Sequence, residues 1–283
     1  MPPGPATGFV AGPDPAIRGE ASGEGTPIVL CHGLTATRSS VIHNSRALER
    51  AGHRVVIYDA RGHGESDPAP GGEGYGYPEL VDDLERVVTE EVGPRRHFLL
   101  GGHSMGAHTA LGYALRHSRR LAGLILIGPS YEGPASAASL AYWDGLATAL
   151  EAGGIDAFVA YTERVQPTDA RWRDSVRRFT RERLQRHRHL GAVVAALREV
   201  PRSRPFGTVN DLRDLEVPAL VVASHDAADP GHPYATAAAY AWRLPRAELI
   251  VEPEGQSPLA WQGGRLSRAI AGFAAEPAVA ERL

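Results

Sequence analysis

The sequence predicts an α/β fold: a doubly wound, mostly parallel sheet with a helical lid inserted into it. Short runs rich in Val, Ile and Leu alternate with amphipathic helical patterns such as residues 78–92. Continuous apolar runs are typical of parallel strands buried on both faces, and the alternation favours right-handed crossovers. The runs lie at residues 28–31, 54–58, 98–100, 121–127, 219–223 and 249–251.

The alternation stops between residues 131 and 213, where the patterns are helical and no strand-like run occurs. We therefore expect a core domain formed by residues 1–130 and 214–283, with residues 131–213 as a helical lid. Eight arginines fall within residues 171–188. We interpret them as a solvated face, with Asp174 and Glu182 as local partners. Attraction of an anionic substrate is the alternative.

Composition excludes several classes of protein. The chain has 283 residues, of which 43% are hydrophobic, and a net charge of −3, so no general attraction to nucleic acid or membrane is expected. All 30 basic residues are arginine. Without lysine there is no Schiff-base amine and no P-loop lysine. The single cysteine, Cys31, cannot form an intrachain disulfide. No GxGxxG follows the first predicted strand, so a dinucleotide site is unsupported.

The strongest local motif is Gly-x-Ser-x-Gly at Gly102, Ser104 and Gly106. A predicted strand precedes it and a helical pattern, 109–115, follows it. This context is typical of a nucleophile elbow, in which a sharp strand-to-helix turn presents the serine hydroxyl above the sheet. The following helix directs its positive end at the same place, which favours a developing oxyanion.

Around this motif the sequence resembles the α/β-hydrolase superfamily over nearly its whole length. PIVLCHGL at residues 27–34 resembles the strand and His-Gly segment of that family, and YDARGHGES at residues 58–66 resembles its Asp-x-Arg-Gly-His-Gly-x-Ser turn. The resemblance implies an oxyanion hole formed by the backbone N–H groups of Leu34 and Met105. It implies a structural role for His63. We expect six residues near the site to contact substrate: His32, Gly33, His103, Tyr142, Trp143 and Gln256.

In this family the catalytic acid follows the strand after the lid. The corresponding segment here is SHDAADPGHP at residues 224–233, and Asp229-Pro230 resembles the family's Asp-Pro. Asp226, nearer the strand end, is the alternative acid. A simple capping role for either carboxylate at the start of the next helix is also open.

The catalytic base is missing from its usual place. The family has Gly-His after the last strand, whereas this chain has Gly255-Gln256, and no histidine follows His232. An amide cannot accept a proton from a serine hydroxyl at neutral pH. Removing the base of a triad enzyme costs about 10⁶-fold in turnover, so the defect bears on function.

Three explanations are open. His232, three residues after Asp229, could supply the imidazole from the acid loop; His225, His187 or His189 could reach the serine instead; or the pocket has no base. His225, Asp226, Asp229 and His232 could also be read as metal ligands, but no supporting motif accompanies them. We expect no metal and no cofactor.

Three functions follow. The first is a serine hydrolase acting on a small-molecule ester, lactone or thioester through Ser104. The second is a cofactor-free lyase, cyclase or isomerase that uses the same pocket and oxyanion hole. The third is a non-catalytic ligand-binding protein. We expect a small-molecule partner, no nucleic acid and no membrane, and a cytoplasmic location, because residues 1–15 lack the features of a secretory signal. Oligomeric state is not readable from the sequence.

Overall fold

A single sheet lies at the centre of the molecule. A computed structural model describes residues 5–166 and 168–283. The described residues form an eight-stranded sheet in the order β1-β2-β4-β3-β5-β6-β7-β8, in which β1, β2 and β4 pair antiparallel and the rest pair parallel. The predicted α/β class is confirmed. The strands are β1 (Thr7–Ala11), β2 (Ile17–Ser22), β3 (Thr26–Cys31), β4 (His53–Tyr58), β5 (Phe98–His103), β6 (Leu121–Ile127), β7 (Ala219–Ala223) and β8 (Ala247–Val251).

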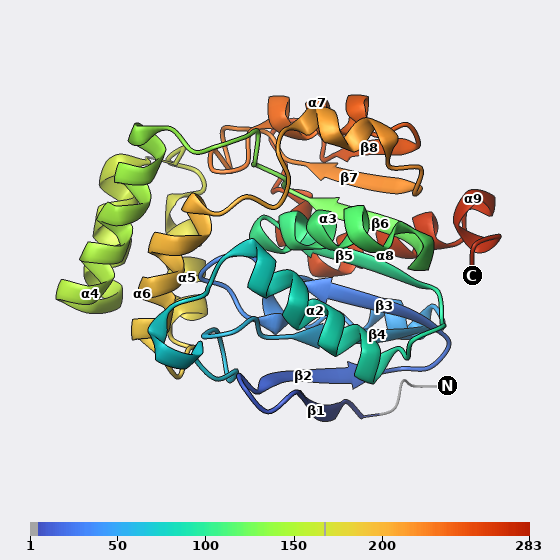
Figure 1. Cartoon of the computed structure of the whole chain (residues 1–283). Coiled ribbons are helices and arrows are strands. Elements are labelled where there is room, and N and C mark those ends of the chain that lie inside the picture. Colours follow the sequence, from blue (N-terminus) through green and yellow to red (C-terminus); the bar gives the residue numbers. More distant parts are fainter. Residues whose placement is uncertain (1–4, 167) are drawn as a thin grey trace.

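Helices cover both faces of the sheet (Figure 1). The apolar sides of α2, α3 and α7 pack in one core cluster with the strands, and those of α1, α8 and α9 pack in a second cluster on the opposite face. Because both faces are covered, every residue of β6 is buried, which explains its uninterrupted apolar run. These helices are α1 (Ala47–Arg50), α2 (Tyr77–Glu91), α3 (Met105–His117), α7 (Tyr234–Arg243), α8 (Gly263–Ala274) and α9 (Pro277–Ala280).

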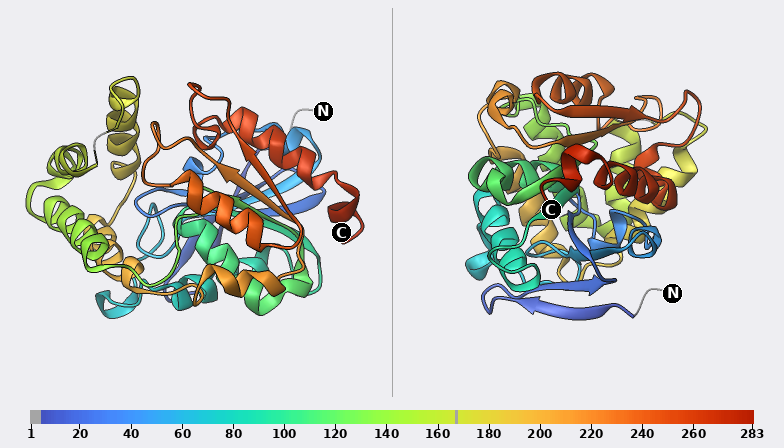
Figure 2. Two further views of the ribbon diagram at one scale, coloured as in Figure 1. Left: turned by 90° about the horizontal axis from the view of Figure 1, so that it is seen from above. Right: turned by 90° about the vertical axis from the view of Figure 1, so that its right-hand side faces the viewer.

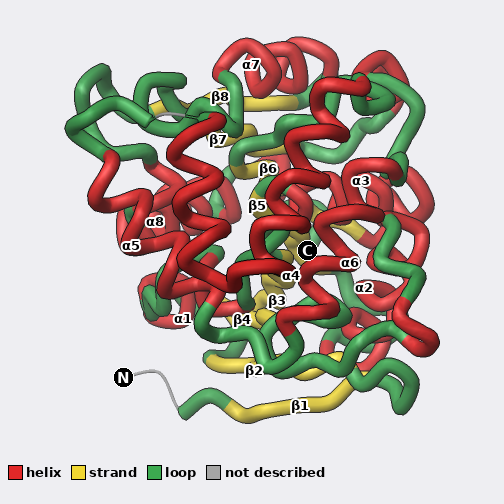
Figure 3. Tube along the Cα trace, turned by 90° about the vertical axis from the view of Figure 1, so that its left-hand side faces the viewer, coloured by secondary structure: helices red, strands yellow, loops and turns green. Residues whose placement is uncertain are grey.

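The segment that the sequence predicts to be a lid, and for which we keep that name, stands beyond the carboxyl ends of the parallel strands (Figures 2 and 3). It contains α4 (Ala137–Val165), α5 (Arg173–Leu184) and α6 (Leu190–Glu199). Leu146, Phe158 and Leu197 belong to a separate apolar cluster that joins these helices to one another. The short turn at Val209–Asp214 already packs on the core, since its Leu212 lies in the same cluster as α7. The helical layer therefore ends before the boundary at residue 213 that the sequence predicts.

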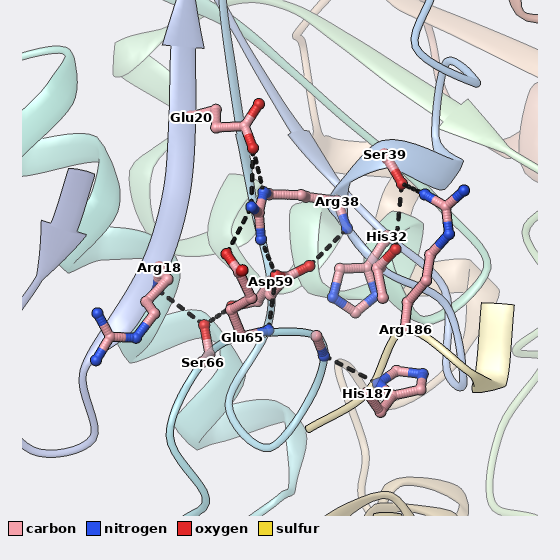
Figure 4. Close-up of polar contacts among 12 residues, drawn as sticks. Arg18, Glu20, His32, Arg38, Ser39, Asp59, Glu65, Ser66, Arg186 and His187 are labelled. Carbon is pink, nitrogen blue, oxygen red and sulfur yellow. Dashed lines mark hydrogen bonds and ion pairs between the residues drawn. The ribbon is translucent and has the colours of Figure 1, made fainter. Parts of the chain in front are cut away.

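One histidine fastens the lid to the core (Figure 4). The Nδ1 atom of His187 accepts the Gly64 N–H at 2.9 Å, and its Nε2 atom donates to the Thr35 carbonyl at 3.0 Å. His187 therefore bonds two core loops at once and is not free to serve as the catalytic base. The same loops are tied together by Arg38, whose guanidinium binds Asp59 and contacts Glu20 at 2.8 Å.

The His187 contacts make the stability of the protein sensitive to acid. Burial lowers the pKa of His187 from 6.5 to about 4, so its stabilising effect is complete above pH 6.5 and is lost as the pH falls toward 4. Wild type should lose about 1–2 kcal/mol of unfolding free energy through this residue between pH 7 and pH 5. Urea unfolding at both pH values should show a smaller loss in His187→Gln. His189→Gln, two residues away, serves as the control, and an equal loss in all three proteins would contradict this assignment.

Candidate active site

Ser104 occupies a strained turn between β5 and α3. Its backbone has φ 53° and ψ −117°, a conformation that costs non-glycine residues about 1–3 kcal/mol. The Ser104 N–H is held by the Ile127 carbonyl of β6 at 2.9 Å. The turn therefore has the geometry of the predicted nucleophile elbow, with the residue at the carboxyl ends of two central strands. Among the described residues, the Ser104 hydroxyl makes no hydrogen bond.

The two glycines of the motif are required by close backbone contacts. A Cβ atom on Gly102 would lie 2.3 Å from the carbonyl carbon of Gly106, and one on Gly106 would lie 2.2 Å from the Cys31 oxygen. Both separations are far below van der Waals contact. The absence of side chains thus allows α3 to begin directly against β3 and points its first N–H groups at the site.

The predicted oxyanion hole lies beside Ser104. Met105 is the first residue of α3, so its N–H has no partner within the helix. Leu34 follows Gly33, whose ideal Cβ position is 3.4 Å from the Ser104 Cβ. This loop is held by His32, which donates from Nδ1 to the Gly33 carbonyl at 2.8 Å and accepts the Ala60 N–H at Nε2 at 2.9 Å. His32 is thereby fully engaged in positioning the loop and is not among the residues that line the main cavity, contrary to the expectation that it contacts substrate.

A carboxylate–imidazole pair lies in the loop after β7. The Nδ1 atom of His232 is 2.9 Å from both carboxylate oxygens of Asp229. The backbone N–H of His232 also donates to the backbone carbonyl of Asp229 at 3.1 Å. This bond closes a turn that folds the imidazole back over the acid. Burial raises the pKa of Asp229, but the nearby His232, His103 and Arg183 together lower it below its usual value. An ionised Asp229 accepts the Nδ1 proton, which leaves Nε2 of His232 as a proton acceptor.

The pair and Ser104 share one cavity of about 430 Å³, which we call the main cavity because it is lined by all three of these residues. Gly33, Leu34 and His103 contribute to its walls. The His103 ring lies 4.7 Å from the His232 ring, and burial lowers the pKa of His103 to about 3, so it is neutral. Its Nε2 atom is buried without a partner.

The other candidates in the acid loop point elsewhere. The Asp226 carboxylate accepts the Tyr234 N–H at 2.7 Å and so caps the start of α7. His225 bonds through Nε2 to the Glu252 carbonyl at 3.0 Å. Neither residue lines the main cavity. The structure brings together Asp229 and His232, and it leaves Asp226 and His225 outside.

Gln256 does not reach the main cavity. Its side chain is exposed, and its Oε1 atom accepts a hydrogen bond from Arg265 at 2.8 Å. The expectation that Gln256 contacts substrate is therefore not met, because the loop after β8 turns this residue to the surface. Trp261, later in the same loop, lines the main cavity instead, where its ring lies 6.1 Å from that of Phe179 of the lid.

Residues of the lid form part of the wall of the main cavity. Tyr142 and Trp143 of α4 line it as expected, with Phe158 beside them. The Tyr142 hydroxyl donates to the Gln166 side chain at 2.8 Å. Arg183 of α5 also lines the cavity, although it is not among the site residues expected from the sequence. The signal was present, because Arg183 lies four residues after Phe179, on the apolar side of the helix.

One group of described residues has donors close enough to be considered for a metal ion. His103, Asp229 and His232 each offer an atom within 4.8 Å of the others. However, Nδ1 of His232 is bonded directly to Asp229, which is the arrangement of a carboxylate–imidazole pair. The atoms that could bind a metal are therefore already bonded to each other. The alternative interpretation of the acid loop as a metal site would also need His225 and Asp226, which point away from this group.

Comparison with known proteins agrees with the geometry. A putative carbamate hydrolase RutD of Variovorax paradoxus is 33% identical over 143 residues, covering 50% of this chain and 51% of that protein. Epoxide hydrolase B of Mycobacterium tuberculosis is 36% identical over 110 residues, 39% of this chain and 30% of that protein. The chain thus spans about half or less of the length of these curated relatives.

Solved structures match over almost the entire chain. A thermophilic esterase from Thermogutta terrifontis, with malate bound, aligns with a TM-score of 0.71 and 26% identity over 95% of this chain and 98% of that one. An esterase from Exiguobacterium antarcticum aligns with a TM-score of 0.75 and 20% identity, which supports the fold alone. The family model of the alpha/beta hydrolase fold matches residues 26–211. With that match over more than half of its length, the chain belongs to the alpha/beta hydrolase fold family.

Proposed function

We propose that this protein is a serine hydrolase that cleaves a small-molecule ester, lactone or thioester, with Ser104 as nucleophile and His232 as base. The observation that carries the proposal is the Asp229–His232 pair at 2.9 Å, which lines the same cavity as Ser104. The base is relocated: it comes from the acid loop, three residues after its own carboxylate. Proteins similar to this chain include ones named as a carbamate hydrolase and as an esterase, which supports the proposal.

In this mechanism Ser104 attacks the substrate carbonyl while its proton passes to Nε2 of His232. The N–H groups of Leu34 and Met105 stabilise the tetrahedral oxyanion, and Asp229 stabilises the imidazolium that forms. His232 then gives its proton to the leaving alcohol or thiol. Water repeats the sequence on the acyl-enzyme, again with His232 as base. Hydrogen bonds of this kind often form only when substrate is bound, which is consistent with a free Ser104 hydroxyl.

A fluorophosphonate probe tests the nucleophile. We expect the wild-type protein to gain one covalent adduct at Ser104, because an activated serine attacks phosphorus as it attacks a carbonyl. Intact-mass spectrometry and peptide mapping measure the adduct. Ser104→Ala should remain unmodified, and Ser130→Ala, which changes a second serine lining the same cavity, is the matched control. A wild-type protein that resists the probe would rule out the proposal.

A second candidate is favoured by the unbonded Ser104 hydroxyl. A lyase, cyclase or isomerase needs the oxyanion hole and a closed pocket, and it needs no serine nucleophile. For that function, catalysis would survive Ser104→Ala and the product would retain all substrate atoms.

The wider biological setting is also a proposal. We propose a small-molecule substrate as the partner, with no nucleic acid and no membrane surface involved, and a cytoplasmic location. Within the described part of the chain, no helix has both the length and the hydropathy required to span a bilayer.

A further inference from the structure

Four arginines of α5 fall into two groups. Those on the outer side of α5 are paired with carboxylates at the surface: Arg177 contacts Glu163 at 2.6 Å, Arg181 binds Asp156, and Arg178 lies 3.9 Å from Glu182. Their partners account for their charge. These residues form the solvated face that the sequence predicts. Of the two expected partners, Glu182 lies near Arg178, whereas the other two carboxylates in these pairs come from α4.

Arg183 is different from these residues. It lies on the inner side of α5, its Nε atom is buried without a partner, and it lines the main cavity. Among the residues that the structure describes, its guanidinium forms no hydrogen bond and no ion pair. Burial lowers the pKa of Arg183, and the nearby Tyr142 and Asp229 only partly offset that effect.

An unpaired cation in a closed pocket is unfavourable unless an anion joins it. Asp229 is an acidic group that acts on Arg183, but both oxygens of that carboxylate are 2.9 Å from His232 Nδ1. The guanidinium therefore retains its donors for something that enters the cavity. Its planar fork of N–H groups matches the two oxygens of a carboxylate.

We propose that the substrate carries a carboxylate away from its scissile carbonyl, and that Arg183 binds this group. The inference rests on the proposed hydrolase function. A single negative charge fits best because Arg183 is the only arginine among the described residues that line the cavity. The cavity lining also offers hydroxyl groups, such as those of Thr162 and Thr180, which can complement a carboxylate without adding charge.

Two pairs of esters test the proposal with the intact protein. Mono-4-nitrophenyl glutarate is compared with 4-nitrophenyl valerate, which places the carboxylate on the acyl side. The second pair, 4-acetoxybenzoate and 4-acetoxybenzamide, places it on the alcohol side. We expect Arg183→Gln to reduce kcat/KM about 10- to 100-fold more for the anionic member of at least one pair, because charge-assisted hydrogen bonds are lost only there. Arg178→Gln removes the same charge from the outer side of α5 and should leave the ratio unchanged.

A competing interpretation is that Arg183 acts through Asp229, by holding that carboxylate ionised. In that case Arg183→Gln would lower kcat equally for the neutral and anionic members of both pairs, and the proposal would be overturned. If Arg183 binds the substrate carboxylate, Arg183→Gln should raise KM for the anionic ester and leave KM for the neutral ester unchanged. Arg183→Lys should restore part of the anion preference, because it returns the charge without the fork.

Binding of glutarate to Ser104→Ala separates this proposal from the hydrolase assignment. Isothermal titration calorimetry should show glutarate binding that is lost when Arg183→Gln is added and kept when Arg178→Gln is added. If Ser104→Ala binds glutarate in this way but the wild-type protein hydrolyses no ester, the hydrolase assignment is overturned and the anion site is supported. Ester hydrolysis with neither glutarate binding nor an Arg183-dependent preference would overturn the anion site and leave the hydrolase standing.

Discussion

Replacing His232 with alanine should reduce kcat for an activated ester by about 10⁴- to 10⁶-fold, because Ser104 then has no group to accept its proton. Asp229→Asn should cost about 10⁴-fold, since an amide favours the wrong tautomer of the imidazole. Steady-state kinetics with 4-nitrophenyl acetate measure both losses. Fluorophosphonate labelling of Ser104 should slow in parallel.

Two neighbouring residues provide matched controls for these variants. Asp226→Asn makes the same chemical change three residues earlier, on a carboxylate that caps α7 with a 2.7 Å hydrogen bond. Asparagine caps helices about as well as aspartate, so activity and stability should be retained. His225→Gln changes a histidine bonded to the Glu252 carbonyl and should also keep most of the activity.

Added imidazole distinguishes a lost base from a distorted pocket. After subtraction of the protein-free reaction of imidazole with the ester, free imidazole should raise the rate of His232→Ala and leave that of Ser104→Ala unchanged, because only the first variant still has the nucleophile. A His232→Ala protein that keeps more than a tenth of the wild-type kcat would show that the base lies elsewhere. The assignment of Asp229 would then lose its basis.

The sheet could be predicted because its strands are buried on both faces. The run at 121–127 is bounded as the strand is, and the run at 98–100 continues for three further residues of the strand. Strands β1 and β2 were not predicted. They form an antiparallel edge. In β2 apolar residues alternate with polar residues and glycine, and in β1 the apolar residues are only Phe9, Val10 and Ala11, with Val10 exposed, so neither strand has the buried apolar run of a central parallel strand.

The acid loop shows where sequence reasoning stops. Residue spacing placed Asp229 and His232 within one loop, but the turn between them decides whether the imidazole folds back or points to solvent. That turn is closed by the bond from the His232 N–H to the Asp229 carbonyl, which no local pattern required. Asp226 has the same charge and lies nearer to the strand. Its role differs from that of Asp229 because its carboxylate accepts a hydrogen bond from the first residue of α7.

Gln256 and His32 also show that the position of a residue in a motif does not determine the orientation of its side chain. Both occupy positions where the family resemblance implies a site residue. Gln256 lies at the surface, where it bonds to Arg265, and both ring nitrogens of His32 are used by backbone groups. Partners distant in sequence decide these orientations, so motif position alone could not. Arg183 was overlooked for the converse reason, because a charge within an arginine-rich segment suggests a solvated face.

Gly106→Ala should destabilise the protein by about 3 kcal/mol or more, whereas Gly272→Ala should stabilise it by up to about 1 kcal/mol. Both glycines are in helices. A Cβ atom at residue 106 would lie 2.2 Å from the Cys31 oxygen, and β3 cannot move away because it is bonded to β4 and β5. At residue 272 a Cβ atom meets nothing within 4 Å.

Urea unfolding measures both effects. The opposite signs follow from packing alone, since the helix propensity term is the same and favours alanine in each case. Gly106→Ala should also lose fluorophosphonate labelling, because moving the start of α3 away from β3 displaces the Met105 N–H and the Ser104 turn together. A Gly106→Ala protein with wild-type stability and labelling would mean that α3 does not begin against β3, and the oxyanion hole would have to be sought elsewhere.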